Sequence, residues 1–117
     1  MQQQTLLRPA TEWELQSLLA EATKTASPLE IAGAGSKRDI GRPVNNAACL
    51  TTSSLSGIRP SGPTGLVMAP RSGTPLARVE AELAAKGQIL AFEPIDLAPV
   101  IGHEAGRATI GAVFATN

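Results

Sequence analysis

Hydrophobic and polar positions in the first third of the chain predict a strand, a helix and a second strand. Residues 5–8 form a short piece that ends at a proline, and proline favours extended backbone in the residue before it. Thr11 and Glu14 have the spacing of a capping box, which marks the start of a helix. Apolar residues then recur at helical spacing, at Leu15, Leu18, Leu19 and Ala22. Another short strand is predicted over 29–32.

The middle of the chain is rich in residues that interrupt regular structure. The segment 33–46, GAGSKRDIGRPVNN, contains three glycines, four charges and a proline, so it predicts a loop. An apolar pattern resumes over 47–51. Serine, glycine and proline then become frequent over 52–65, which is typical of a boundary between two subdomains.

The second half of the chain predicts one further helix between two strands. An apolar strand is expected over 66–69. Thr74 can serve as the N-cap with Pro75 in the first helical position, where the missing N–H of proline is tolerated. The helix ends at Gly87. Its apolar face consists of Leu76, Val79 and Leu83. We expect a strand over 88–92 and irregular backbone beyond it.

Composition narrows the classes of function. Ten lysines and arginines balance ten aspartates and glutamates, and this neutrality argues against nucleic acid or an anionic membrane as a partner. Cys49 is the only cysteine and His103 the only histidine, which excludes an intrachain disulfide and any metal site that needs two of either. No run approaches the length of a membrane-spanning helix, and the start of the chain does not resemble a signal peptide. We therefore expect a cytoplasmic setting and no metal.

The strongest candidate for chemistry is the glycine-rich segment after the strand over 29–32. Glycines permit positive φ and let successive backbone N–H groups point into one concavity that holds a phosphate. The residues in question are Gly33, Ala34, Gly35, Ser36, Lys37 and Gly41. Neither the Rossmann motif nor the Walker A motif fits, because Arg38 stands where the Rossmann motif needs its last glycine. Spacing alone therefore leaves two interpretations open, a cofactor loop and an ordinary flexible connection.

A second candidate is the run of small and apolar residues over 109–117, TIGAVFATN. Small side chains let a flat ligand approach the backbone, while threonine and asparagine supply hydrogen bonds. The alternative is an edge strand packed on small side chains. Asp96 has a comparable ambiguity, because an aspartate two residues after a proline can bind a ligand or stabilise a turn.

The order of these segments resembles the FAD-linked oxidases of the vanillyl-alcohol oxidase and p-cresol methylhydroxylase (PCMH) type. The resemblance covers nearly the whole chain. It rests on Arg8-Pro9 before a helix, then LEIAGAGSK, LVMA with SGTPL, GQILAFEP, and finally TIGAVFATN. Within the family, AGSK and GQILAFEP are most similar to the E subunits of bacterial glycolate oxidases.

The resemblance implies an α+β fold, the N-terminal part of a PCMH-type FAD-binding domain. Residues 1–56 would form a small βαβ subdomain with the pyrophosphate loop, and 57–117 the beginning of a second, truncated α+β subdomain. FAD would lie between them. The implied cofactor-binding residues are Gly33, Ala34, Gly35, Ser36, Lys37, Gly41, Pro94, Asp96, Thr109, Ile110, Gly111, Ala115, Thr116 and Asn117. Ser36 stands where covalent members carry a flavin-linked histidine, so FAD is expected to bind noncovalently. Ala112 replaces a glycine that is usual in the family.

The function implied is the FAD-binding portion of a bacterial, flavin-dependent 2-hydroxy-acid (glycolate) oxidase or dehydrogenase subunit. Its implied partners are a second flavin subunit and an iron–sulfur subunit. Family members run to several hundred residues, so we expect this chain to be a fragment that is inactive alone and holds no catalytic residue. The alternative is a noncatalytic assembly module that no longer binds flavin. Either way, residues such as Leu66, Val67 and Phe114 would lack cover, which favours a homodimer.

Overall fold

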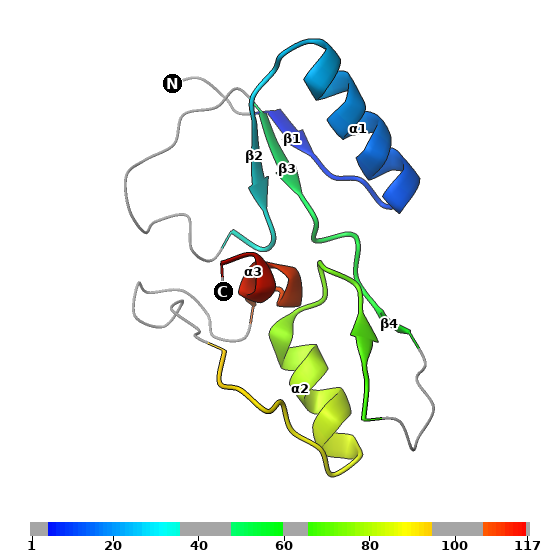
Figure 1. Ribbon diagram of the computed structural model, residues 1–117, viewed down its shortest axis with the longest axis vertical. Coiled ribbons are helices and arrows are strands. Elements are labelled where there is room, and N and C mark those ends of the chain that lie inside the picture. The colour runs from blue at the N-terminus through cyan, green and yellow to red at the C-terminus, as the bar shows by residue number, and fades with distance from the viewer. Residues whose placement is uncertain (1–4, 36–47, 60–65, 95–106, 117) are drawn as a thin grey trace.

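The computed structural model describes residues 5–35, 48–59, 66–94 and 107–116 (Figure 1). Within them lie five strands and three helices, which mix in one α+β fold as predicted. In chain order the elements are β1 (Thr5–Leu7), α1 (Glu12–Lys24), β2 (Leu29–Ala32), β3 (Ala48–Thr51), β4 (Ile58–Arg59), β5 (Ala69–Pro70), α2 (Leu76–Ala85) and α3 (Ile110–Thr116).

The first three strands form a parallel sheet in the order β1-β3-β2. The central strand β3 is the most buried of the three, because it has a neighbouring strand on each side. Cys49 is 3% exposed and Leu50 is fully buried. Leu50 lies opposite both Leu7 and Ile31 in the register. The strand predictions over 5–8, 29–32 and 47–51 are thus confirmed where the structure describes these residues.

Helix α1 begins at the predicted capping box. The hydroxyl of Thr11 accepts a hydrogen bond from the amide of Glu14 at 3.1 Å. The carboxylate of Glu14 accepts in return from the amide of Ala10 at 3.1 Å, one residue before the N-cap. The helix lies beside the three-stranded sheet (Figure 1), but none of its residues is buried and Trp13 is 74% exposed. Its apolar face is therefore only half covered.

The second group of elements is β4, β5 and the two later helices. Strands β4 and β5 pair antiparallel, with Ile58 opposite Pro70. The main apolar core of this group is formed by Leu76, Val79, Leu83 and Ile110. Figure 1 shows α3 between the end of the three-stranded sheet and α2. Helix α3 thus lies where the two groups of elements meet.

Thr74 has a different role from the predicted N-cap. The N-cap of α2 is Pro75, which has no side-chain capping hydrogen bond. The hydroxyl of Thr74, which is fully buried, instead donates to the carbonyl of Gly57 at 2.9 Å and accepts from its amide at 3.0 Å. The hydroxyl therefore ties the start of α2 to the segment before β4. The N-cap prediction was wrong because a nonlocal backbone partner takes this hydroxyl.

Two strand predictions in the second half fail. Residues 88–92 form no strand, because the amide of Gln88 bonds the carbonyl of Leu83 at 2.8 Å and completes the C-terminal cap of α2. Gly87, with φ of 67°, is the left-handed residue of this cap, so the predicted end of the helix is confirmed. The strand expected over 66–69 is reduced to β5, which begins at Ala69.

The edge strand offered as one interpretation of 109–117 is also wrong. Residues 110–116 form the helix α3, and only Thr109 makes a bridge, to Pro75. Thr109 accepts a hydrogen bond from the amide of Ala112 through its hydroxyl, at 3.3 Å. This local bond supports the first turn of a helix. The small residues of the run would also have fitted a strand at the edge of a sheet.

Candidate functional site

The candidate site is built around the turn that follows β2. Gly33, Ala34 and Gly35 lie directly after the strand and are half-buried. Gly35 has φ of 75°, a left-handed conformation that glycine adopts without strain. Gly35 therefore has the positive φ that the sequence predicted for this turn. The remaining predicted loop residues, Ser36, Lys37 and Gly41, lie outside the described residues.

Thr51 at the end of β3 holds this turn in place. Its hydroxyl donates to the carbonyl of Gly33 at 2.7 Å, and the amide of Thr52 donates to the carbonyl of Ala32 at 2.9 Å. Thr51 is 6% exposed, so its hydroxyl bond is shielded from water. The sequence analysis missed this residue. Its only local signal is a hydroxyl at the end of an otherwise apolar buried strand.

The turn also touches the C-terminal segment. A Cβ atom at Gly33 would overlap the hydroxyl oxygen of Thr109 and would lie 2.9 Å from its Cγ2. Such a distance leaves no space for a side chain at position 33. Thr109 is 2% exposed and therefore fixed in the interior. The structure thus brings together two parts of the predicted site that lie far apart in the sequence.

The polar groups at the start of α3 are engaged within the chain. The amide of Ile110 donates to the carbonyl of Thr74 at 2.9 Å, and that of Gly111 donates to the carbonyl of Ser72 at 2.9 Å. A Cβ at Gly111 would lie 2.8 Å from the Cβ of Ser72, so glycine is required there for packing. These groups anchor the C-terminal segment, and in this arrangement their amides do not face a ligand.

The remaining predicted site residues are described by their position and burial alone. Pro94 is half-buried near the end of a described range, and Ala115 is exposed on α3. Thr116 is the last residue of α3, and Ala112, which replaces the expected glycine, is half-buried. Asp96 and Asn117 lie outside the described residues. The structure therefore joins the turn after β2 to the start of α3 and leaves the remaining contacts as predictions.

Two further findings concern metal ligands and helix length in the described residues. Over 5–35, 48–59, 66–94 and 107–116, no three histidine, cysteine, aspartate or glutamate side chains gather as metal ligands. In the same ranges, no helix has both the length and the apolar character needed to cross a membrane.

The described residues of this turn, Gly33, Ala34 and Gly35, have no ionisable or nucleophilic side chain. A turn with a left-handed glycine, at the carboxyl end of a parallel strand, is a place where backbone amides can face a ligand. The left-handed Gly35 fits a turn at which a phosphate approaches backbone amides closely, whereas the lack of space for a Cβ at Gly33 reflects packing against Thr109 within the chain.

Comparisons with known proteins identify the family of this chain. The profile of a family described as an FAD binding domain matches residues 4–117. Among curated proteins, the glycolate oxidase subunit GlcE of Escherichia coli strain K12 is 41% identical over 93 residues. The aligned region is 77% of this chain and 25% of that subunit, so the chain spans about a quarter of the length of this relative.

Proposed function

The chain belongs to the FAD binding domain family, whose cofactor is FAD, and we propose that it forms the pyrophosphate-binding part of a flavin-dependent 2-hydroxy-acid oxidase subunit. Glycolate is the substrate class favoured by the identity of 41% to the glycolate oxidase subunit. The whole reaction would need the remaining length of such a subunit. Within the 117 residues, no side chain is assigned a catalytic role.

The observation that carries this proposal is the close approach of Gly33 to Thr109. The hydroxyl of Thr51 and the buried Thr109 fix the position of the turn before any ligand arrives, which lowers the entropic cost of binding. The backbone of Gly33, Ala34 and Gly35 would hold the phosphates. Ser36 and Lys37 follow directly in the sequence and would add a hydroxyl donor and a positive charge.

The chain's own contribution is to bind and orient the cofactor. Bound flavin supplies the hydride-accepting chemistry, and the protein determines which face and edge are accessible. We propose noncovalent attachment, because Ser36 stands where covalent relatives have a histidine. We also propose two subdomains, 1–56 and 57–117, with FAD bound where they meet. A second flavin subunit and an iron–sulfur subunit are the proposed partners.

An FAD titration followed by flavin fluorescence tests this function. FMN and ADP serve as ligand controls, and acid treatment then separates released from covalently attached flavin. We expect saturable binding that favours FAD and complete release by acid. Binding of FMN and FAD with equal affinity would contradict a site for the pyrophosphate.

Charge reversal locates the site within the chain. The variants Lys37→Glu and Arg38→Glu should each weaken FAD binding, because they place a carboxylate beside the phosphates. Lys24→Glu is the matched control, since Lys24 is in the last turn of α1, ahead of β2, and thus at the other end of that strand. Equal effects of all three variants would indicate a general charge effect and remove the role of Lys37 and Arg38.

A folded chain that binds no FAD would support the alternative, a noncatalytic assembly module. One observation favours that alternative. Several large apolar side chains on the face formed by α2, α3 and the adjoining loops are exposed, as a surface that contacts another protein would be.

A further inference from the structure

The turn over 71–74, between β5 and α2, is hydrogen-bonded both to the segment after β3 and to the start of α3. We call it the junction turn. The amide of Gly73 donates to the carbonyl of Leu55 at 2.8 Å. A Cβ atom at Gly73 would overlap the carbonyl oxygen of Thr52, so no side chain fits there. The junction turn is therefore packed tightly against the segment 52–57.

The other side of the junction turn holds the start of α3. The carbonyls of Ser72 and Thr74 accept hydrogen bonds from the amides of the first two residues of α3, each at 2.9 Å. Thr109 comes directly before these two amides, and its side chain packs against the turn after β2. The junction turn thus determines where Thr109 lies.

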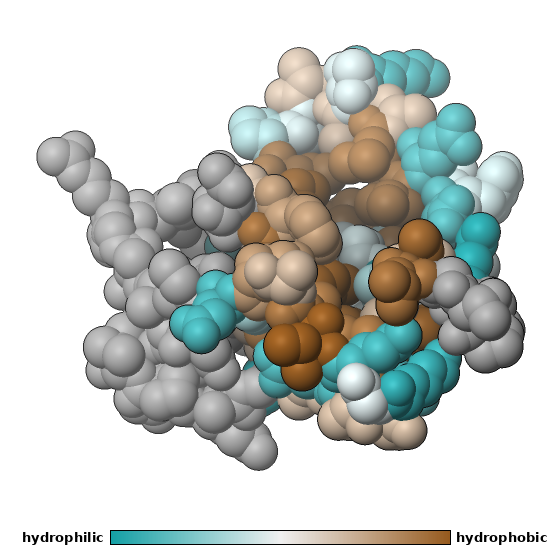
Figure 2. Space-filling view, turned by 60° about the horizontal axis from the view of Figure 1, so that its bottom comes forward, coloured by the Kyte–Doolittle hydropathy of each residue, from teal (hydrophilic) through white to brown (hydrophobic). Residues whose placement is uncertain are grey.

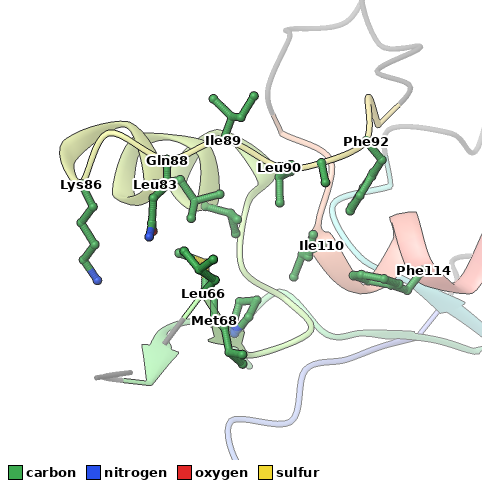
Figure 3. Close-up of a pocket in the computed structure, with 14 residues that line it drawn as sticks. Leu66, Met68, Leu83, Lys86, Gln88, Ile89, Leu90, Phe92, Ile110 and Phe114 are labelled. Atoms are coloured by element: carbon green, nitrogen blue, oxygen red, sulfur yellow. The ribbon is translucent and has the colours of Figure 1, made fainter. Parts of the chain in front are cut away.

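Apolar contacts hold α3 to α2 in the same region. Ile110 is 4% exposed and belongs to one core cluster with Val79 and Leu83 of α2. The rings of Phe92 and Phe114 pack edge to face with centroids 6.0 Å apart, on the same side of Ile110 in Figure 3. Figure 2, with the α2 end brought forward, shows apolar side chains gathered here around a hollow. The start of α3 is therefore packed as one unit with α2 and the junction turn.

Thr74 links the two sides of the junction turn. Its hydroxyl donates to the carbonyl of Gly57 at 2.9 Å and accepts from its amide at 3.0 Å. Its own carbonyl accepts from the amide of Ile110. One residue thus bonds the segment after β3 through its side chain and α3 through its backbone. Thr74 is fully buried, so its side chain acts only through these neighbours.

We propose that Thr74 is a positioning residue for the cofactor, which holds the start of α3 against the turn after β2 and so strengthens FAD binding without touching FAD. The inference rests on the proposed function, because it takes the turn as the phosphate site. With the hydroxyl in place, Thr109 stays packed on Gly33 and the turn is ordered before FAD arrives. Without it, binding must also fix the start of α3, and the freedom lost there weakens the affinity.

Three variants at position 74 test the hydroxyl. Thr74→Val keeps the shape without the hydroxyl, Thr74→Ser keeps the hydroxyl, and Thr74→Cys carries a thiol that is a weak donor and acceptor. Fluorescence titration should give a dissociation constant for FAD that is about fivefold or more higher for valine than for the parent. Serine should restore the parental value, and cysteine should lie between the two. The cysteine variant decides the question if the valine variant does not fold.

Hydrogen exchange measured by NMR without FAD is the second readout. In Thr74→Val, the amides of Ile110 and Gly111 should exchange about tenfold faster or more, because their acceptors lie in the loosened junction turn. Thr11→Ala is the matched control for stability. It removes the N-cap bond of α1, which lies outside the junction turn. The control should keep the parental FAD affinity and should speed these two amides no more than others that are equally protected.

The outcomes separate this inference from the proposed function. Equal FAD affinity in the parent and a folded Thr74→Val variant would overturn the inference, as would an equally large loss of affinity in Thr11→Ala. A folded parent chain that binds no FAD would contradict the proposed function instead. Faster exchange at Ile110 and Gly111 in the valine variant would then still support the hold of Thr74 on α3, and unchanged exchange would overturn it.

Discussion

Thr109 lies so close to Gly33 that not even a methyl group fits at position 33. The contact joins the turn after β2 to the start of α3, and both sides of it are fixed by hydrogen bonds. Thr51 holds the carbonyl of Gly33, while Thr109 accepts from the amide of Ala112. The relative position of the two candidate segments is therefore set by packing, before any ligand is present.

A methyl group at position 33 should destabilise the chain and be partly rescued at position 109. Gly33→Ala should lower the free energy of unfolding by about 1–3 kcal/mol through overpacking. In the double variant Gly33→Ala/Thr109→Ala, the hydroxyl and Cγ2 are removed, although the Cβ of residue 109 still lies 3.1 Å from the new atom. Urea unfolding of all four proteins measures the coupling. Strictly additive losses would show that these two residues do not contact each other in solution.

Two glycines with similar backbone separate strain from function. Gly35 and Gly87 have φ of 75° and 67°, so alanine should cost about 1–2 kcal/mol at either position. A Cβ at Gly87 meets nothing within 4 Å, which makes Gly87→Ala a control for strain alone. Gly35→Ala should also raise the dissociation constant for FAD about tenfold, equivalent to 1.4 kcal/mol. Fluorescence titration checks this, and equal FAD affinity in the two variants would argue against a role for the turn.

The buried hydroxyl of Thr74 should contribute measurably to the stability of the chain. Thr74→Val keeps the shape but leaves the amide and carbonyl of Gly57 without this partner, at a cost of about 1–3 kcal/mol. Thr23→Val is the control. Its hydroxyl bonds the carbonyl of Leu19 on the exposed side of α1, so the change should stay within about 0.5 kcal/mol. Thermal unfolding measures the loss of stability in both variants. Equal losses would show that the buried hydroxyl of Thr74 stabilises the chain no more than the exposed hydroxyl of Thr23.

Elements with local signals were predictable from the sequence. The capping box at Thr11 and Glu14 places the start of α1, and the left-handed Gly87 places the end of α2. Elements that depend on distant partners were not. The hydroxyl of Thr74 could have capped α2, but Gly57 takes it. Likewise, within the described ranges the run that starts at Thr109 pairs only through an isolated bridge to Pro75 and then becomes a helix.

The same distinction applies to the candidate site. The turn after β2 could be predicted from its glycines, because glycine by itself permits the left-handed backbone that a tight turn needs. The role of Thr51 was not, since it depends on β2 and β3 lying side by side. The packing of Gly111 on Ser72 was equally hidden, and it shows that this glycine serves close contact within the chain.

The most direct test of the central claim is a two-dimensional amide NMR spectrum of the isotope-labelled chain during addition of FAD. The claim is that the turn after β2 binds the phosphates. It predicts that the amide signals of Gly33, Ala34 and Gly35 shift progressively and saturate, while that of Gly87 stays in place. Saturation with FAD that leaves the turn signals unmoved, or that shifts only the signals of residues outside the turn, would contradict it.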